Sequence, residues 1–180
     1  MLILVFTLAI GQGNQIIVGH LIGARELDKA YRRCIQSLQA AMVISFAIAL
    51  IFAVFRFNLL GIFSDNNLIL HIGGQLLLLH ILLEPGRTFN IVVSSALQAA
   101  GDAKFPVIIS IVIVWLFMVP LAYVLGIYFN LGLLGIWIAL TADEWLRGLI
   151  LLARWRSKIW QTKAIFQYSP EKKTAVQVKA

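Results

Sequence analysis

Long apolar stretches separated by short polar segments dominate this chain of 180 residues. A helix needs about 20 mostly apolar residues to cross the roughly 30 Å hydrocarbon core of a bilayer. On that basis we expect five transmembrane helices, over residues 2–22, 38–63, 69–99, 107–129 and 133–152. The pattern predicts an all-α integral membrane protein, with a membrane helical bundle over residues 1–160 and a basic cytoplasmic tail over residues 161–180.

The composition agrees with a membrane environment. Hydrophobic residues make up 61% of the chain and charged residues only 13%, whereas soluble domains average about 45–50% apolar and about 25% charged residues. The net charge of +7 would suggest nucleic-acid binding in a soluble protein. Here the basic residues lie between and after the apolar stretches, so we expect a lipid bilayer as partner and no nucleic acid.

The distribution of Lys and Arg predicts the orientation. Twelve of these 15 residues fall in the connector at 23–33, in the turn at 101–106 and in the tail from Arg154. These three segments alternate onto one side of the membrane, and the opposite side has only Arg56. Cytoplasmic loops are enriched in Lys and Arg. We therefore expect a multi-pass protein of the cell (plasma) membrane, with its N-terminus outside and its C-terminus in the cytoplasm.

Ionisable residues inside an apolar stretch are informative, because each costs about 2.5–3.5 kcal/mol in a bilayer unless it is paired or hydrated. Glu84, Arg87, Asn90 and Ser94 follow one another at helical spacing within the third stretch, so they share one helix face. Pro85 lacks an amide hydrogen. A carbonyl freed beside it is a candidate ion ligand, as in the discontinuous helices of transporters.

Polar residues also occur at comparable depth in the first and fifth stretches. Such groups can satisfy one another only by facing a common interior. We interpret three carboxylates as cation-coupling candidates, two arginines as their charge partners and four uncharged polar residues as lining a substrate cavity. These are, in that order, Glu84, Asp143 and Glu144; Arg87 and Arg147; and Gln12, Gln15, Asn90 and Ser94.

A structural interpretation of the same residues stays open. Glu84–Arg87 and Asp143–Arg147 have the spacing of self-neutralising pairs that fix helix packing. Gln12 and Gln15 have the chemistry of interhelical hydrogen-bonding groups. Near the C-terminus, Trp155 and Trp160 alternate with basic residues, which predicts an interfacial anchor.

Motifs of enzymes and metalloproteins are missing from the sequence. It has no Cys/His metal spacing, no phosphate-binding Gly loop and no obvious nucleophile–base pair. We therefore expect no enzyme activity, no metal and no cofactor, apart from a coupling ion that is Na⁺ or H⁺.

Three segments together resemble the C-terminal half of the multidrug and toxic compound extrusion (MATE) transporters. Residues 15–24, QIIVGHLIGA, look like the glycine-rich end of a family helix. The EPGR motif at 84–87 and the LQAAGD motif at 97–102 are similar to the family's tenth helix and the following loop. GLLGIW at 132–137, followed by DEWLR at 143–147, looks like the twelfth helix.

This resemblance implies part of a larger protein. The family fold has twelve helices in two lobes, and this chain corresponds to the eighth to twelfth helices, a partial C-terminal lobe. The implied function is a cation-coupled antiporter that exports drugs or other toxic organic compounds, with a small, cationic organic substrate. Alternating access needs two lobes, so we expect the chain to be inactive without an N-terminal lobe, supplied in cis or in trans.

Two other functions remain to be weighed. One is a membrane-embedded accessory or structural subunit without transport of its own, which fits a fragment, a truncated reading frame or one piece of a split transporter. The other is a lipid-linked sugar flippase of the same superfamily, in which we would expect more basic groups along the pathway than the two embedded arginines.

Overall fold

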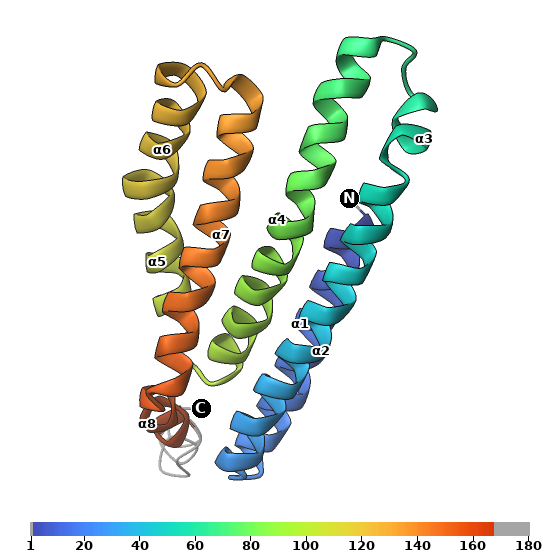
Figure 1. Cartoon of the computed structure of the whole chain (residues 1–180). Coiled ribbons are helices and arrows are strands. Elements are labelled where there is room, and N and C mark those ends of the chain that lie inside the picture. Colours follow the sequence, from blue (N-terminus) through green and yellow to red (C-terminus); the bar gives the residue numbers. More distant parts are fainter. Residues whose placement is uncertain (1, 168–180) are drawn as a thin grey trace, which may run out of the picture.

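The computed structural model describes residues 2–167, which fold almost entirely into helices and contain no strand. In chain order (Figure 1) the elements are α1 (Leu2–Gly23), α2 (Leu27–Val54), α3 (Arg56–Gly61), α4 (Asn67–Ala99), α5 (Lys104–Ile113), the π-helix η1 (Val114–Met118), α6 (Val119–Tyr123), the π-helix η2 (Val124–Tyr128), α7 (Gly132–Arg156) and α8 (Ile159–Gln167).

The long helices run roughly along one axis (Figure 1). Helices α1, α2 and α4 pack on one another, and α7 lies between α4 and the continuous helix formed by α5, η1, α6 and η2. The α1–α2 and α4–α5 connections and α8 lie at one end of the bundle, and the α3–α4 and η2–α7 connections at the other. The described parts of the three basic segments therefore share one end.

Four helical segments are long and apolar enough to cross a membrane, namely 4–23, 27–54, 67–99 and 104–128. The chain is thus a multi-pass, all-α membrane protein. The fifth expected span, α7, has 25 residues and therefore a length of roughly 37 Å. Every stretch of 18 residues within it contains three charged residues, Asp143, Glu144 and Arg147, so α7 is not among these four segments and its span stays a prediction.

The helices around the second expected span, 38–63, have other bounds than the span, which itself stays a prediction. Helix α2 begins at Leu27, and the chain breaks at Phe55 before the short helix α3. The early start has a physical reason. Ala30, Cys34 and Leu38 recur every four residues and are buried, while the charged side chains between them point outward. The polar connector thus shrinks to residues 24–26, where Arg25 adopts a left-handed φ of 61°.

The C-terminal segment also differs from expectation. The chain turns at Lys158, which has a φ of 57°, and α8 folds back against the bundle. Trp155 and Trp160 are both fully buried and stacked with ring centroids 4.2 Å apart, so the predicted interfacial anchor is wrong for both. The expected tail over 161–180 begins inside α8, and residues 168–180 lie outside the described residues.

Candidate functional site

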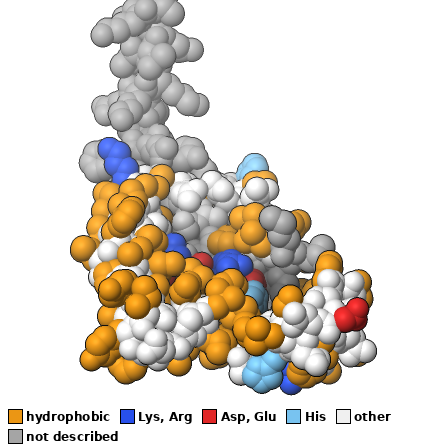
Figure 2. All heavy atoms as spheres, turned by 90° about the horizontal axis from the view of Figure 1, so that it is seen from above, with side chains coloured by type: hydrophobic (Ala, Val, Ile, Leu, Met, Phe, Trp, Pro, Cys, Tyr) orange, Lys and Arg blue, Asp and Glu red, His pale blue; other side chains and the backbone are white. Residues whose placement is uncertain are grey.

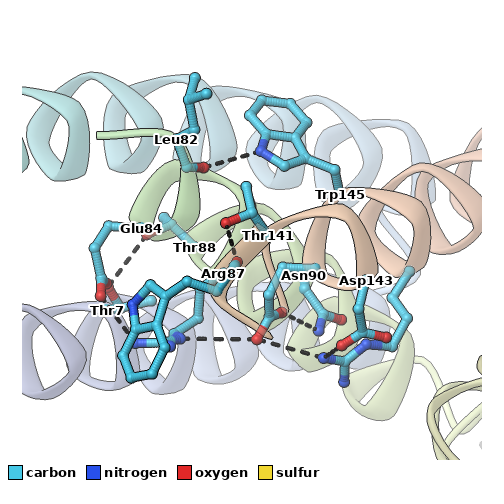
Figure 3. A network of polar contacts seen from close by, with 12 residues as sticks. Thr7, Leu82, Glu84, Arg87, Thr88, Asn90, Thr141, Asp143 and Trp145 are labelled. Carbon is cyan, nitrogen blue, oxygen red and sulfur yellow. Dashed lines mark hydrogen bonds and ion pairs between the residues drawn. The ribbon is translucent and has the colours of Figure 1, made fainter. Parts of the chain in front are cut away.

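A network of charged side chains joins the middle of α4 to α7 (Figure 3). On α4, the Arg87 guanidinium lies 2.9 Å from Oε1 of Glu84, whose side chain is buried. The Nε atom of the same arginine lies 3.7 Å from Oε1 of Glu144 on α7. Arg87 therefore bridges carboxylates of two helices and does not serve Glu84 alone.

The second half of the network lies on α7. Nη2 of Arg147 donates to Oδ2 of Asp143 and lies 3.3 Å from Oε1 of Glu144. Glu144 receives a further hydrogen bond at its other oxygen, since Nδ2 of Asn90 donates to Oε2 over 2.9 Å. All five charged candidates from the sequence thus belong to one connected group. Seen along the bundle, some basic and acidic side chains lie toward the centre of this face among hydrophobic ones, and others lie at its edge (Figure 2).

The network has more carboxylates than cations. Its three carboxylates face two guanidinium groups, Arg87 and Arg147, so the fully ionised group has a net charge of −1. Two buried carboxylate oxygens, Oε2 of Glu84 and Oδ1 of Asp143, have no hydrogen-bond partner in the described part of the chain. Buried charge is costly unless it is paired and hydrogen-bonded. These two oxygens are therefore sites where a proton or a cation would be stabilised.

The four expected cavity residues do meet in space. A cavity of about 280 Å³ between α1, α4 and α5 is lined by Gln12, Gln15, Asn90 and Ser94, together with Leu8, Gly11, Ile91, Ser95, Gln98 and Ser110. Its polar groups are amides and hydroxyls, and none of the described residues that line it is charged. Asn90 belongs to both the cavity wall and the charged network.

Buried polar contacts hold α1 against α4 beside this cavity. Nδ2 of Asn14 donates to the Val92 carbonyl over 3.1 Å and lies 3.4 Å from the Ser95 hydroxyl. The hydroxyls of Thr7 and Thr88 lie 3.2 Å apart. Sequence reasoning missed these threonines. The signal was present, because Thr7 and Asn14 are seven residues apart and so share one face of α1.

Beside Pro85, the contact to α7 is made by an aromatic side chain. The indole N–H of Trp145 donates to the Leu82 carbonyl over 2.9 Å, and α4 continues as a helix through Pro85. A carbonyl in the turn before the proline thus accepts a bond from the protein. A second cavity, of about 360 Å³ and mostly apolar, opens here between α2, α4 and α7 and is lined by Met42, Val43, Phe46, Ile81, Leu82, Pro85 and Trp145.

Another charged cluster, which sequence reasoning missed, lies at the α4–α5 connection. Asp102 is 1% exposed; it accepts a hydrogen bond from Nε of Arg154 over 2.9 Å and pairs with Lys163 on α8. The Arg154 guanidinium also lies over the ring of Phe105. This cluster ties α8 to the bundle. Within residues 2–167, no group of three or more His, Cys, Asp or Glu side chains is arranged to hold a metal ion.

One known protein family matches most of this chain. Residues 1–124, about two thirds of the chain, match the MatE family. The chain belongs to the MatE family. The resemblance to MATE transporters seen in the sequence is thereby confirmed, whereas correspondence to the C-terminal half stays a prediction. MATE proteins are transporters and not enzymes.

Relatives of this MatE chain include named transporters. It is 44% identical to the "Uncharacterized transporter YisQ" of Bacillus subtilis, with 92% of this chain and 36% of the relative aligned. It is 26% identical to the "Probable multidrug resistance protein YoeA" of the same species, over 87% of this chain and 34% of the relative. It is 25% identical to the "Multidrug resistance protein NorM" of Photobacterium profundum, over 76% and 31%.

The MatE chain spans about a third of the length of these relatives. No solved structure matches it.

Proposed function

We propose that this chain is part of a cation-coupled antiporter that exports drugs or other toxic organic compounds across the cytoplasmic membrane. The observation that supports this most is the charged network between α4 and α7. It combines a net charge of −1 with two carboxylate oxygens that have no hydrogen-bond partner among residues 2–167, and it adjoins a polar cavity through Asn90. A network used only for packing would gain stability if its charges were balanced and its buried oxygens paired.

In this function, the carboxylates exchange a cation with substrate. Entry of H⁺ or Na⁺ at Oε2 of Glu84 or Oδ1 of Asp143 would neutralise the excess negative charge. A proton needs a single oxygen, whereas a sodium ion needs several oxygen ligands around it. Arg87 and Arg147 share the remaining carboxylate oxygens and keep the other negative charges compensated. Because one excess charge attracts one cation, a cationic substrate and the coupling ion would compete.

The rest of the transporter completes this function. We place the chain as the eighth to twelfth helices of a two-lobe protein, in the plasma membrane, with its N-terminus outside and its C-terminus in the cytoplasm. The basic end of the bundle supports this orientation. Alternating access requires a second lobe that moves against this one. The partner is therefore an N-terminal lobe in cis or in trans, and the chain alone should bind ligands but not transport them.

The flippase alternative has less support. Recognition of a lipid-linked sugar phosphate would need basic side chains available to the phosphates. Both embedded arginines are already occupied by carboxylates on α4 and α7.

A chimera tests the proposal. This chain would replace the matching segment of the Bacillus subtilis transporter YisQ, and the chimera would be reconstituted in liposomes for measurement of drug-stimulated proton flux and radioactive sodium uptake. Glu84→Gln and Asp143→Asn should each abolish coupled flux. Glu26→Gln is the matched control, because Glu26 is a partly exposed carboxylate at the α1–α2 turn and, within residues 2–167, its ion pair is with Lys29.

Three outcomes would contradict the proposal. Unchanged coupled flux in both network variants, at normal membrane levels, would reduce the carboxylates to packing. An equal loss of coupled flux in the Glu26→Gln control would mean that the effect is not specific to the network. Absence of drug-stimulated ion flux in the chimera, measured beside a parent YisQ that shows such flux, would indicate an accessory subunit.

A further inference from the structure

Asn90 is the one residue in the described part of the chain that both lines the polar cavity and bonds to the charged network. Its side chain is 9% exposed. Nδ2 lies 2.9 Å from Oε2 of Glu144. Within residues 2–167 the amide oxygen, Oδ1, takes part in no hydrogen bond, which leaves it available on the cavity side.

The charge of Glu144 determines which way this amide points. An ionised carboxylate only accepts hydrogen bonds, whereas an amide has a donor end and an acceptor end. The NH₂ group of Asn90 must therefore face Glu144 while that residue is ionised, and the cavity then meets an oxygen acceptor. The two oxygens of Glu144 have different partners within residues 2–167, since Oε1 faces Arg87 and Arg147 and Oε2 accepts from Asn90.

Neutralising Glu144 reverses this arrangement. The charged groups that face it are Arg87 on α4 and Arg147 and Asp143 on α7. Because the guanidinium groups occupy Oε1, a proton from water would bind at Oε2, and the resulting O–H would need an acceptor. Rotation of the Asn90 amide by half a turn supplies Oδ1 as that acceptor and turns NH₂ toward the cavity. The cavity then presents a donor where it had presented an acceptor.

We infer that Asn90 is a specificity-determining residue that relays the ionisation of Glu144 to the polar cavity and selects ammonium ligands with an N–H group. This inference rests on the proposed function, because it takes the cavity to be a substrate site. With Glu144 ionised, Oδ1 of Asn90 accepts from the ligand's N–H. With Glu144 protonated, two donors would face each other and the ligand is released.

The relay predicts a particular ligand class. A protonated primary, secondary or tertiary amine has an N–H donor, whereas a quaternary ammonium ion has the same charge and none. The uncharged lining of the cavity cannot tell the two apart by charge. Any preference for the protonated amine must therefore come from a hydrogen bond, and Asn90 is the acceptor whose availability depends on the network.

A binding experiment on the intact 180-residue chain, purified in lipid nanodiscs, tests this inference. Calorimetric titration at neutral pH would compare N,N-dimethylbenzylamine, which is then protonated, with benzyltrimethylammonium. A hydrogen bond to a charged group is strong enough for the wild type to bind the tertiary amine about tenfold more tightly. Asn90→Leu should bring the two affinities together. Ser110→Ala, which alters the same cavity on α5 without contact to the network, should keep the tenfold ratio.

A second variant, Glu144→Gln, allows the same conclusion if Asn90→Leu does not fold. Glu144→Gln keeps the side-chain shape but no longer requires the Asn90 NH₂ group, so it should lower the preference several-fold. Equal binding of both ligands to the wild type, or an unchanged preference in either network variant, would overturn the relay and leave the proposed function standing. Binding of neither ligand to the wild type would overturn the cavity as a substrate site and the relay with it.

Discussion

Trp145 on α7 and Leu82 on α4 are joined by a hydrogen bond of 2.9 Å from the indole N–H to the main-chain carbonyl. The contact lies in the helical turn that precedes Pro85, and the indole and the ring of Phe89 pack in a T-shaped arrangement with centroids 6.0 Å apart. It fixes the rotation of α7 relative to α4 at the level of the charged network. The network geometry therefore depends on this aromatic contact as well as on the ion pairs.

Gly86 is the position at which this contact is most easily disturbed. A Cβ atom at Gly86 would lie 2.7 Å from Cδ1 and 2.8 Å from Nε1 of Trp145. We expect Gly86→Ala to displace the indole, to break its bond to Leu82 and to destabilise the chain by about 1–3 kcal/mol, the usual cost of overpacking. Thermal unfolding in detergent measures this. In a Trp145→Phe background, which lacks the N–H, Gly86→Ala should destabilise the chain by less. An equal loss of stability in both backgrounds would contradict a role of the Trp145–Leu82 bond.

Gly135 should be still less tolerant, because its neighbour is backbone. An added Cβ would lie 2.6 Å from the Leu125 carbonyl carbon and 2.7 Å from the Gly126 nitrogen of η2. Gly135→Ala therefore forces α7 away from η2 and should lower the unfolding temperature clearly. The matched control is Gly13→Ala in α1, where an added Cβ would meet no atom of another described element within 4 Å. Helix propensity predicts that this variant gains about 0.5–1 kcal/mol of stability. A neutral Gly135→Ala variant would show that the two helices separate readily.

Some of this site was predictable from the sequence. The spacing of Glu84, Arg87 and Asn90, and of Asp143 and Arg147, predicts which groups share a face on each helix. Spacing within one helix says nothing about the rotation of its neighbour, so the pairing of Asn90 with Glu144 and the bridging by Arg87 could not be predicted.

The burial of Trp155, Trp160 and Asp102 was equally inaccessible to sequence reasoning. Basic residues beside tryptophan are typical of an interface, and the reversal at Lys158 that folds α8 back is encoded in a single left-handed residue. Tyr31, on α2, then packs against Trp155 with centroids 6.3 Å apart, a contact between residues far apart in the chain.

Asp102 should be required for docking of α8. Asp102→Asn removes the charge that pairs with Arg154 and Lys163. The cost should stay below the about 3–5 kcal/mol of a broken, fully buried pair, because Lys163 remains 44% exposed. We expect faster tryptic cleavage at Lys158 and Lys163 in this variant. Asp28→Asn is the control, since the Asp28–Lys158 pair is largely exposed and such pairs contribute about 0–1 kcal/mol; equal cleavage of both variants would contradict a specific role of Asp102.

The ion pair between Glu84 and Arg87 allows a test of charge balance. Arg87→Leu leaves Glu84 buried without its cation and removes one of the two guanidinium groups beside Glu144. Removing one partner of a buried pair costs about 3–5 kcal/mol, whereas replacing both partners by apolar residues is often close to neutral. The double variant Glu84→Leu/Arg87→Leu should therefore unfold at a higher temperature than Arg87→Leu alone. The unfolding temperature should not return fully to that of the wild type, because Glu144 still lacks the contact that Arg87 made at 3.7 Å. If the double variant were less stable than Arg87→Leu, Glu84 would be stabilised by groups other than this arginine, and the charge count on which the network argument depends would have to be revised.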